Sequence, residues 1–258
     1  MEVIILILLA LILLFYFKSK ARKLKNVIKY LTSEEKKILQ EKVLFYTKLT
    51  NEEQLEFEHR MIMFLNQIQI VPYGCRFEPE DRVLIAASAI IPVFGFKNWQ
   101  YPNISTIYLL PNAFNKEFQY VGNDNQRNIL GVVGQGKLSN KMILSQAALR
   151  HGFDNKTDKR NTAIHEFVHL IDMADGDIDG LPESIMESPY TLPWLDLIHC
   201  KMDEIEEGDS DINPYGGTSK IEFFAVASEY FFERPKLLRR KHPELYEKLA
   251  RFFNQDLA

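Results

Sequence analysis

The residues best suited to chemistry are His165 and His169, which stand four apart in the run His-Glu-Phe-Val-His with Glu166 beside the first. On a helix of 3.6 residues per turn this spacing puts both imidazoles on one face, where they can reach one metal ion at about 2.0–2.1 Å. Glu166 then lies beside the metal, as a general base that acts on a metal-bound water. The pattern indicates a zinc-dependent hydrolase.

The residues around this motif predict a buried helix. Its apolar members leave a single polar face, which carries His165, His169 and Asp172. Ionisable side chains on one line of a buried helix are costly unless they are paired or bind a metal. The flanks therefore favour a metal site over two histidines on a partly exposed helix. The apolar members are Ala163, Ile164, Phe167, Val168, Leu170 and Ile171.

A catalytic zinc ion takes three protein ligands and leaves one position for water, so a third ligand must come from elsewhere. Asp175 lies ten residues after the first histidine, where HExxHxxGxxH enzymes place their third ligand, but Asp172 occupies the glycine position of that motif. Glu222 and Glu229, seven apart, fall near one face of a later helix. Ser219 could engage Glu222 in a capping box. From spacing alone, Asp175, Glu222 and Glu229 all remain candidates for the third metal ligand.

The remaining pattern predicts an α+β fold that is rich in helices and has a small β-sheet. Residues 26–70 predict helices, with capping boxes at Thr32–Glu35 and Thr50–Glu53. An edge strand near the motif helix could pair with an extended substrate backbone. Asp175 to Gly180 predicts a turn that ends the motif helix, because a calcium loop would need a glutamate where Met186 stands. Further helices are predicted at residues 82–91, 194–205, 219–232 and 243–253, an acidic surface loop at 204–211, and strands at 104–110, 129–133 and 141–144.

The first residues predict a membrane anchor. Val3 to Phe17 is an unbroken apolar run, and five Lys and Arg residues follow it within eight positions. We expect a transmembrane helix at residues 1–17, a basic juxtamembrane linker at 18–30 and a metallopeptidase domain at 31–258, which the positive-inside rule places in the cytosol. A cleaved signal peptide is less well supported, because Glu2 replaces a basic start and no small-x-small cleavage pattern precedes Ser19.

Composition limits the other classes of function. With 258 residues, 46% of them hydrophobic, the chain can form one sizeable catalytic domain. Two cysteines exclude a disulfide scaffold. Because the whole chain carries −4 and residues 1–25 carry +4, the remainder carries −8, which argues against direct binding of nucleic acid.

Three segments resemble the Mlc titration factor A family of zinc peptidases. They are His-Glu-x-x-His-x-x-Asp-Met at 165–173, Asn-Pro-Tyr at 213–215 and the string from Glu222 to Phe232. The similarity runs from about residue 30 to the C-terminus. Because a membrane anchor is predicted before this region, the chain is expected to be a membrane-anchored member of the family. In place of the family's tryptophan-containing, glycine-proline stretch before the catalytic helix, the chain has Gly134 to Asn140. The substrate specificity of the family is therefore not assigned to this chain.

The resemblance implies a zincin-like, gluzincin-like peptidase domain acting on peptide or protein substrates. An alternative is a membrane-tethered binding module that sequesters a cytosolic regulator, with zinc in a structural role. The implied site comprises Zn²⁺ ligands His165, His169 and Glu222, general base Glu166, Tyr215 assisting at the oxyanion or leaving group, and Asp172 and Glu229 orienting the histidines.

Overall fold

The computed structural model describes residues 29–120, 128–134, 136–155, 158–186 and 191–258. The predicted transmembrane helix at 1–17 and most of the basic linker at 18–30 lie outside the described residues. None of the helices in the described part of the chain combines the length and hydrophobicity that a bilayer crossing needs.

The N-terminal helices form where the capping boxes predict them. They are α2 (Ser33–Lys42), α3 (Leu44–Thr47) and α4 (Asn51–Gln67). Thr32 and Thr50 each accept a hydrogen bond from the backbone of the glutamate three residues on, and each glutamate returns it. The prediction of helix as far as residue 70 is wrong, because Gln69–Pro72 forms strand β1. Pairing with β2 overrides the helical pattern there.

Helix α5 (Pro79–Ile90) confirms the helix predicted at 82–91 and begins three residues earlier. Pro79 stands in the first turn, where its missing N–H costs nothing, and the Glu78 and Asp81 side chains cap the helix reciprocally. Nine of its residues are buried, so α5 is a core helix.

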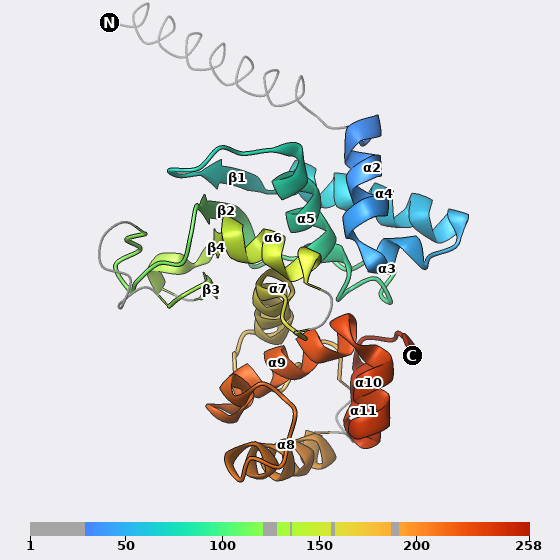
Figure 1. The fold of residues 1–258 in the computed structure, drawn as a ribbon, viewed down its shortest axis with the longest axis vertical. Coiled ribbons are helices and arrows are strands. Elements are labelled where there is room, and N and C mark those ends of the chain that lie inside the picture. Colours follow the sequence, from blue (N-terminus) through green and yellow to red (C-terminus); the bar gives the residue numbers. More distant parts are fainter. Residues whose placement is uncertain (1–28, 121–127, 135, 156–157, 187–190) are drawn as a thin grey trace, which may run out of the picture.

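Among the described residues the sheet has four strands in the order β1–β2–β4–β3 (Figure 1). β2 (Ile104–Leu110), β3 (Gly131–Val133) and β4 (Asn140–Ser145) lie where strands are predicted. β1 and β4 run parallel to β2, and β3 is antiparallel to β4. The small mixed sheet expected from the sequence is therefore present, with one strand more than predicted.

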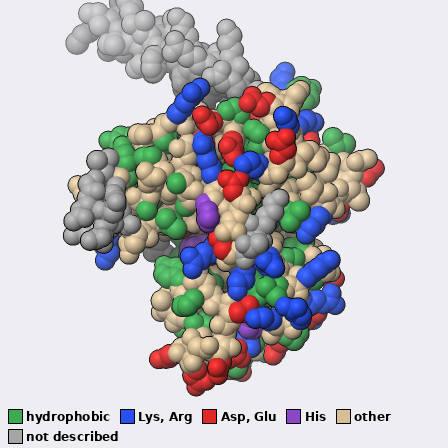
Figure 2. Space-filling view, viewed as in Figure 1, with side chains coloured by type: hydrophobic (Ala, Val, Ile, Leu, Met, Phe, Trp, Pro, Cys, Tyr) green, Lys and Arg blue, Asp and Glu red, His purple; other side chains and the backbone are tan. Residues whose placement is uncertain are grey.

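Six α-helices follow β4 in the described part of the chain, and four of them correspond to predictions. Helix α7 carries the histidine motif and ends in the short helix η3 (Met173–Asp175) and a left-handed Gly176, which confirms the predicted turn. Two helices, α6 and α10, were not predicted. The acidic segment is partly helical, and Figure 2 shows acidic side chains at the lower edge, where α8 lies in Figure 1. The helices are α6 (Gln146–Asp154), α7 (Thr162–Asp172), α8 (Thr191–Glu206), α9 (Lys220–Glu233), α10 (Pro235–Lys241) and α11 (Pro243–Phe252).

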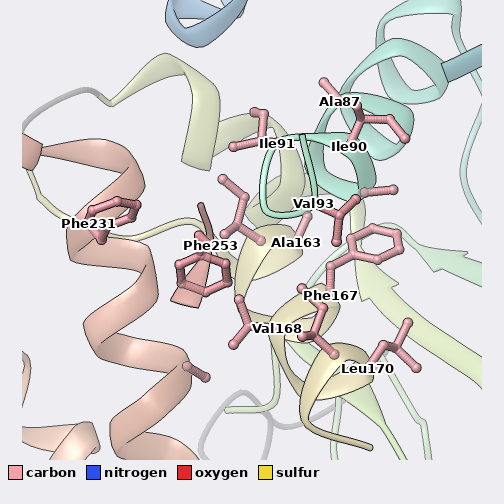
Figure 3. Close-up of a cluster of buried hydrophobic side chains, with 14 of the residues drawn as sticks. Ala87, Ile90, Ile91, Val93, Ala163, Phe167, Val168, Leu170, Phe231 and Phe253 are labelled. Atoms are coloured by element: carbon pink, nitrogen blue, oxygen red, sulfur yellow. The ribbon is translucent and has the colours of Figure 1, made fainter. Parts of the chain in front are cut away.

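Helix α7 lies between a sheet-bearing half, residues 29–155, and a helical half, residues 191–258 (Figure 1). Its apolar side chains pack toward both halves: Phe167 lies near α5, and Val168 lies on the side of Phe253 (Figure 3). Phe167 also contacts the rings of Phe64 and Tyr101. Because large side chains from both halves pack on α7 and ten of its residues are buried, the histidine motif sits on a tightly packed core helix.

Asp211 joins the segment before α7 to the helical half. Its carboxylate accepts hydrogen bonds from the Tyr230 hydroxyl at 2.9 Å and from His242 Nε2 at 2.8 Å. Lys159 and Lys241 place their ammonium groups 3.2 and 3.3 Å from it. Burial acts to raise the pKa of Asp211, but His242, Tyr230 and the lysines hold it well below its usual range. Asp211 precedes the loop that carries Tyr215.

We predict that Asp211→Asn destabilises the fold at neutral pH by about 1–3 kcal/mol, because charged hydrogen-bond partners lose their acceptor. An aspartate whose pKa falls on folding stabilises the protein above its unfolded pKa of about 3.9, and this contribution is lost as the pH falls below that value. The difference in the free energy of unfolding between wild type and variant, measured by urea denaturation, should therefore shrink as the pH is lowered from 7 to 2. Asp209→Asn, an exposed acid nearby, is the control; a pH-independent difference would contradict the assignment.

Candidate metal centre

Helix α7 starts from a cap that also fixes its partner helix. The Asn161 side chain accepts a hydrogen bond from Ile164 N–H at 3.2 Å, and Asn161 N–H donates to Glu229 Oε2 at 2.6 Å. One carboxylate of α9 thus holds the first turn of α7. His165 and His169 lie on the same face of α7, and both are buried.

Three potential ligand atoms converge between α7 and α9. The Nε2 atoms of His165 and His169 are 3.0 Å apart. Glu222 Oε2 lies 3.0 Å from the former and 3.5 Å from the latter. Within the described residues, these three side chains are the group able to hold a metal ion.

The two other acids that spacing left open lie elsewhere. Glu229 Oε1 is 2.7 Å from Nδ1 of His165, on the side of the ring away from Nε2. Asp175 is exposed on η3. Ser219 accepts a hydrogen bond from the backbone N–H of Glu222, at 3.2 Å, which leaves the Glu222 carboxylate for the histidines.

The geometry fits a tetrahedral metal site. With ligand distances of about 2.0–2.1 Å, donor atoms of such a site lie about 3.3–3.4 Å apart, close to the separations observed here. A hydrogen bond from Nδ1 to Glu229 leaves the Nε2 lone pair of His165 directed at the common point. Two imidazoles and a carboxylate are also a donor set that divalent zinc accepts.

The pKa shifts of the three side chains also indicate a cation site between them. Burial acts to lower the pKa of His165, but Glu229, Glu222 and Glu166 outweigh it and raise the pKa to about 10. Burial also acts to raise the pKa of Glu222, which hydrogen bonds from both histidines hold well below its usual range. For His169, burial and the neighbouring His165 lower the pKa. A positive charge among these groups is therefore strongly favoured, whether a proton or a metal ion supplies it.

Gly180 fixes the distance between the two ligand-bearing helices. Its N–H donates to Asp172 Oδ2 at 2.9 Å, and its C=O accepts from the Trp194 indole at 2.9 Å. A Cβ at this position would lie 2.6 Å from the Lys220 carbonyl oxygen, and its φ of +79° is one that side chains disfavour. The backbone of Gly180 thus links the end of α7 to the start of α9. Asp172, which the resemblance implies as a partner of a histidine, binds Gly180 through Oδ2, whereas its Oδ1 and the Nδ1 of His169 are both buried without a hydrogen-bond partner among the described residues.

Glu166 points from α7 toward the sheet. It is 5% exposed, and the Val133 backbone hydrogen-bonds its carboxylate. Burial raises the pKa of Glu166 to about 8, against the opposing effect of His165. A carboxylate with a pKa near neutrality can both take up and release a proton.

Tyr215 lies on η5 (Pro214–Gly217), next to His165. Its ring centroid is 6.0 Å from that of His165, and it is 51% exposed. Burial of the hydroxyl, followed by the charge of Glu222 and a hydrogen bond to it, raises the pKa of Tyr215 to about 12. The phenol therefore remains a hydrogen-bond donor at neutral pH.

Sequence analysis did not identify Gly131, Val133 and Gly180 as parts of the site. A glycine inside a predicted strand is a known signal of close backbone approach, so Gly131 could have been found. The role of Gly180 depends on the packing of α7 against α9, for which spacing gives no signal.

Comparison with known proteins identifies relatives. The family described as "Glucose-regulated metallo-peptidase M90" matches residues 17–254. Mlc titration factor A of Escherichia fergusonii is 28% identical over 225 residues, covering 81% of each chain. The protein of the same name from Serratia proteamaculans is 29% identical and covers 77% of this chain and 80% of its own. An uncharacterized protein of Synechocystis sp. is 28% identical over 228 residues, 84% of this chain and 82% of its own. These matches confirm the family resemblance.

We predict that Glu222→Ala lowers the affinity of the purified chain for Zn²⁺ by at least about 100-fold, because one of three converging donors is lost. Asp175→Ala removes the same charge from an exposed position and should bind Zn²⁺ like wild type. Competition with a chromophoric chelator and elemental analysis measure both. Loss of metal in the Asp175 variant alone would contradict the assignment of Glu222 as the third ligand.

Proposed function

Because the chain belongs to the glucose-regulated metallo-peptidase M90 family, we propose that it is a zinc-dependent peptidase that uses His165, His169 and Glu222 as metal ligands. The observation that carries the proposal is the convergence of these three side chains near Glu166. Glu166 is a buried acid outside the group of metal ligands. A structural zinc site closes its fourth position with a protein group, whereas a catalytic site leaves it open. Among the described residues, three donors with a carboxylate alongside that does not belong to the ligand group support the catalytic arrangement.

The proposed roles follow from the environment of each side chain. Zinc bound at this site would supply a Lewis acid for the attacking water and the scissile carbonyl. Glu166 takes the proton from that water and delivers it to the leaving amine, which suits an acid with a raised pKa. Tyr215 donates a hydrogen bond from its hydroxyl to the oxyanion, since the phenol stays protonated at neutral pH. Glu229 holds the His165 ring in place through Nδ1.

The outer edge of β3, next to the antiparallel bridge between Ile129 and Phe114, supports a peptide as the substrate class. β3 is the last strand of the described sheet, and it contacts α7. An extended peptide adding to that edge would bring its backbone past Glu166 and the metal ligands. Backbone hydrogen bonds of this kind bind any peptide, so sequence preference would depend on side chains around Tyr215 and β3.

We predict that Glu166→Gln keeps bound zinc and lowers kcat by roughly 10²–10⁴-fold, because the amide keeps the shape but cannot accept the proton. Cleavage of a mixed-sequence, quenched-fluorescent peptide library, read by mass spectrometry, measures turnover. Glu52→Gln, an exposed acid on α4, is the matched control. Full activity in the Glu166 variant would remove this residue from the mechanism, and absence of cleavage by the zinc-loaded wild type would count against the peptidase.

A second candidate function is a binding module that holds a protein partner, with zinc in a structural role. It is favoured by the name that two relatives share, Mlc titration factor A, which describes titration by those proteins. Pull-downs with wild type and Glu166→Gln distinguish the two functions. A binding module captures the same intact partner with both forms, whereas a peptidase retains an intact substrate only with the variant and releases fragments with the wild type.

We also propose that residues 1–17 anchor the chain in a membrane, with the peptidase domain on the cytosolic side. The support is the apolar run Val3 to Phe17, the basic cluster after it, and a family match that begins only at residue 17. The full chain should stay in the membrane pellet after alkaline carbonate extraction, and a chain starting at residue 26 should not. Release of the full chain by carbonate would contradict the anchor.

A further inference from the structure

Gly131 lies directly against the Glu166 side chain. A Cβ built at Gly131 would be 2.6 Å from Glu166 Oε1, 2.7 Å from Cγ and 2.9 Å from Cδ. Real Cβ atoms essentially never approach other heavy atoms this closely. Because three atoms along the side chain are involved, a rotation of the carboxylate alone would not relieve the overlap. Glu166 is also 5% exposed and has little room to move.

The direction of β3 explains why Gly131 and Val133 act together. Ser145 N–H donates to the Leu130 carbonyl at 2.7 Å, which makes this pair a hydrogen-bonded one in the antiparallel ladder with β4. Since such pairs alternate, the backbone groups of Gly131 and Val133 point away from β4, toward the outer edge of the described sheet, where Ile129 pairs with Phe114. Residues two apart also share a face of the strand. The Val133 backbone and the position that a Gly131 side chain would occupy both contact Glu166, so this stretch of β3 faces α7.

We propose that Gly131 is the positioning residue for Glu166. The absence of a side chain there lets the carboxylate lie against the edge of β3, where the Val133 backbone holds it. The inference rests on the proposed peptidase function for its catalytic meaning, but the contact itself does not depend on activity. A displaced general base costs rate rather than substrate binding, since a misplacement of about 1 Å can lower turnover by about 100-fold.

The chain offers a matched control three residues away. A Cβ added at Gly134 would meet no atom within 4 Å. Gly134 follows β3 directly and makes the same Gly→Ala change possible in the same segment. Replacing glycine by alanine where the backbone permits it usually stabilises a protein slightly, through the unfolded chain. Gly134→Ala is thus expected to keep or raise the melting temperature, and a loss at Gly131 would have the opposite sign.

The test is a double-mutant cycle between Gly131→Ala and Glu166→Ala, read by thermal unfolding of the metal-free full chain. Gly131→Ala should lower the Tm by several degrees in the wild-type background, because about 1 kcal/mol shifts the Tm of a domain of this size by roughly 2–4 °C. In the Glu166→Ala background the same substitution should cause no loss. If Gly131→Ala alone does not fold, recovery of folding in the double variant gives the same answer. An equal loss in both backgrounds, no loss in either, or a double variant that also fails to fold would overturn the proposal.

Kinetics supply a second readout. With the quenched-fluorescent peptide library, Gly131→Ala should lower kcat by roughly 10–100-fold while KM stays within about twofold and zinc content is unchanged. Gly134→Ala should match wild type. A wild type without peptidase activity would defeat the proposed function and leave the stability cycle to decide the role of Gly131. A Gly131 variant with a normal kcat would overturn the proposal even if the contact exists.

Discussion

The site depends on bringing three electron-rich atoms together in a buried place. Two imidazole nitrogens and a carboxylate oxygen lie 3.0–3.5 Å from one another, which is unfavourable unless a positive charge lies among them. The surrounding structure keeps them there by fixing the backbones of α7 and α9. Glu229 binds both the first turn of α7 and His165, and Gly180 links the other ends of the two helices. Removal of either link would loosen the packing of α7 on α9 that holds the three donor atoms together.

Position, more than residue type, gives each glutamate of the site its role. Glu222 receives hydrogen bonds from both histidines, which keep it ionised and ready to act as a ligand. Glu229 is directed at Nδ1 of His165 and at a backbone N–H, so it supports the ring without reaching the metal position. Glu166 faces the sheet, away from such donors except the Val133 backbone, and its pKa rises to about 8. One ligand, one support and one acid–base group thus arise from the same side chain in three environments.

Much of this arrangement was predictable from the sequence, and the failures have physical reasons. Helix α7, both N-terminal capping boxes and strands β2 to β4 follow from local patterns. Strand β1 was missed because Gln69–Pro72 gains its structure from pairing with residues of β2 that lie 37 positions later in the sequence. The choice among Asp175, Glu222 and Glu229 could not be made from spacing, since it depends on how α9 is turned against α7. Family resemblance, which carries tertiary information, pointed to Glu222.

The same dependence on tertiary structure ties the site to the fold as a whole. The histidines lie on α7, Glu222 lies in the helical half, and the contacts of Glu166 come from β3 in the sheet-bearing half. Neither half alone holds the ligands and the acid–base group, so the site forms only when both pack on α7. A metal ion bound by α7 and α9 would in turn stabilise this packing, since ligands that are scattered in the unfolded chain bind it weakly. Metal binding and the docking of the helical half on α7 are therefore linked, whereas the contact of Glu166 with β3 depends on the sheet-bearing half.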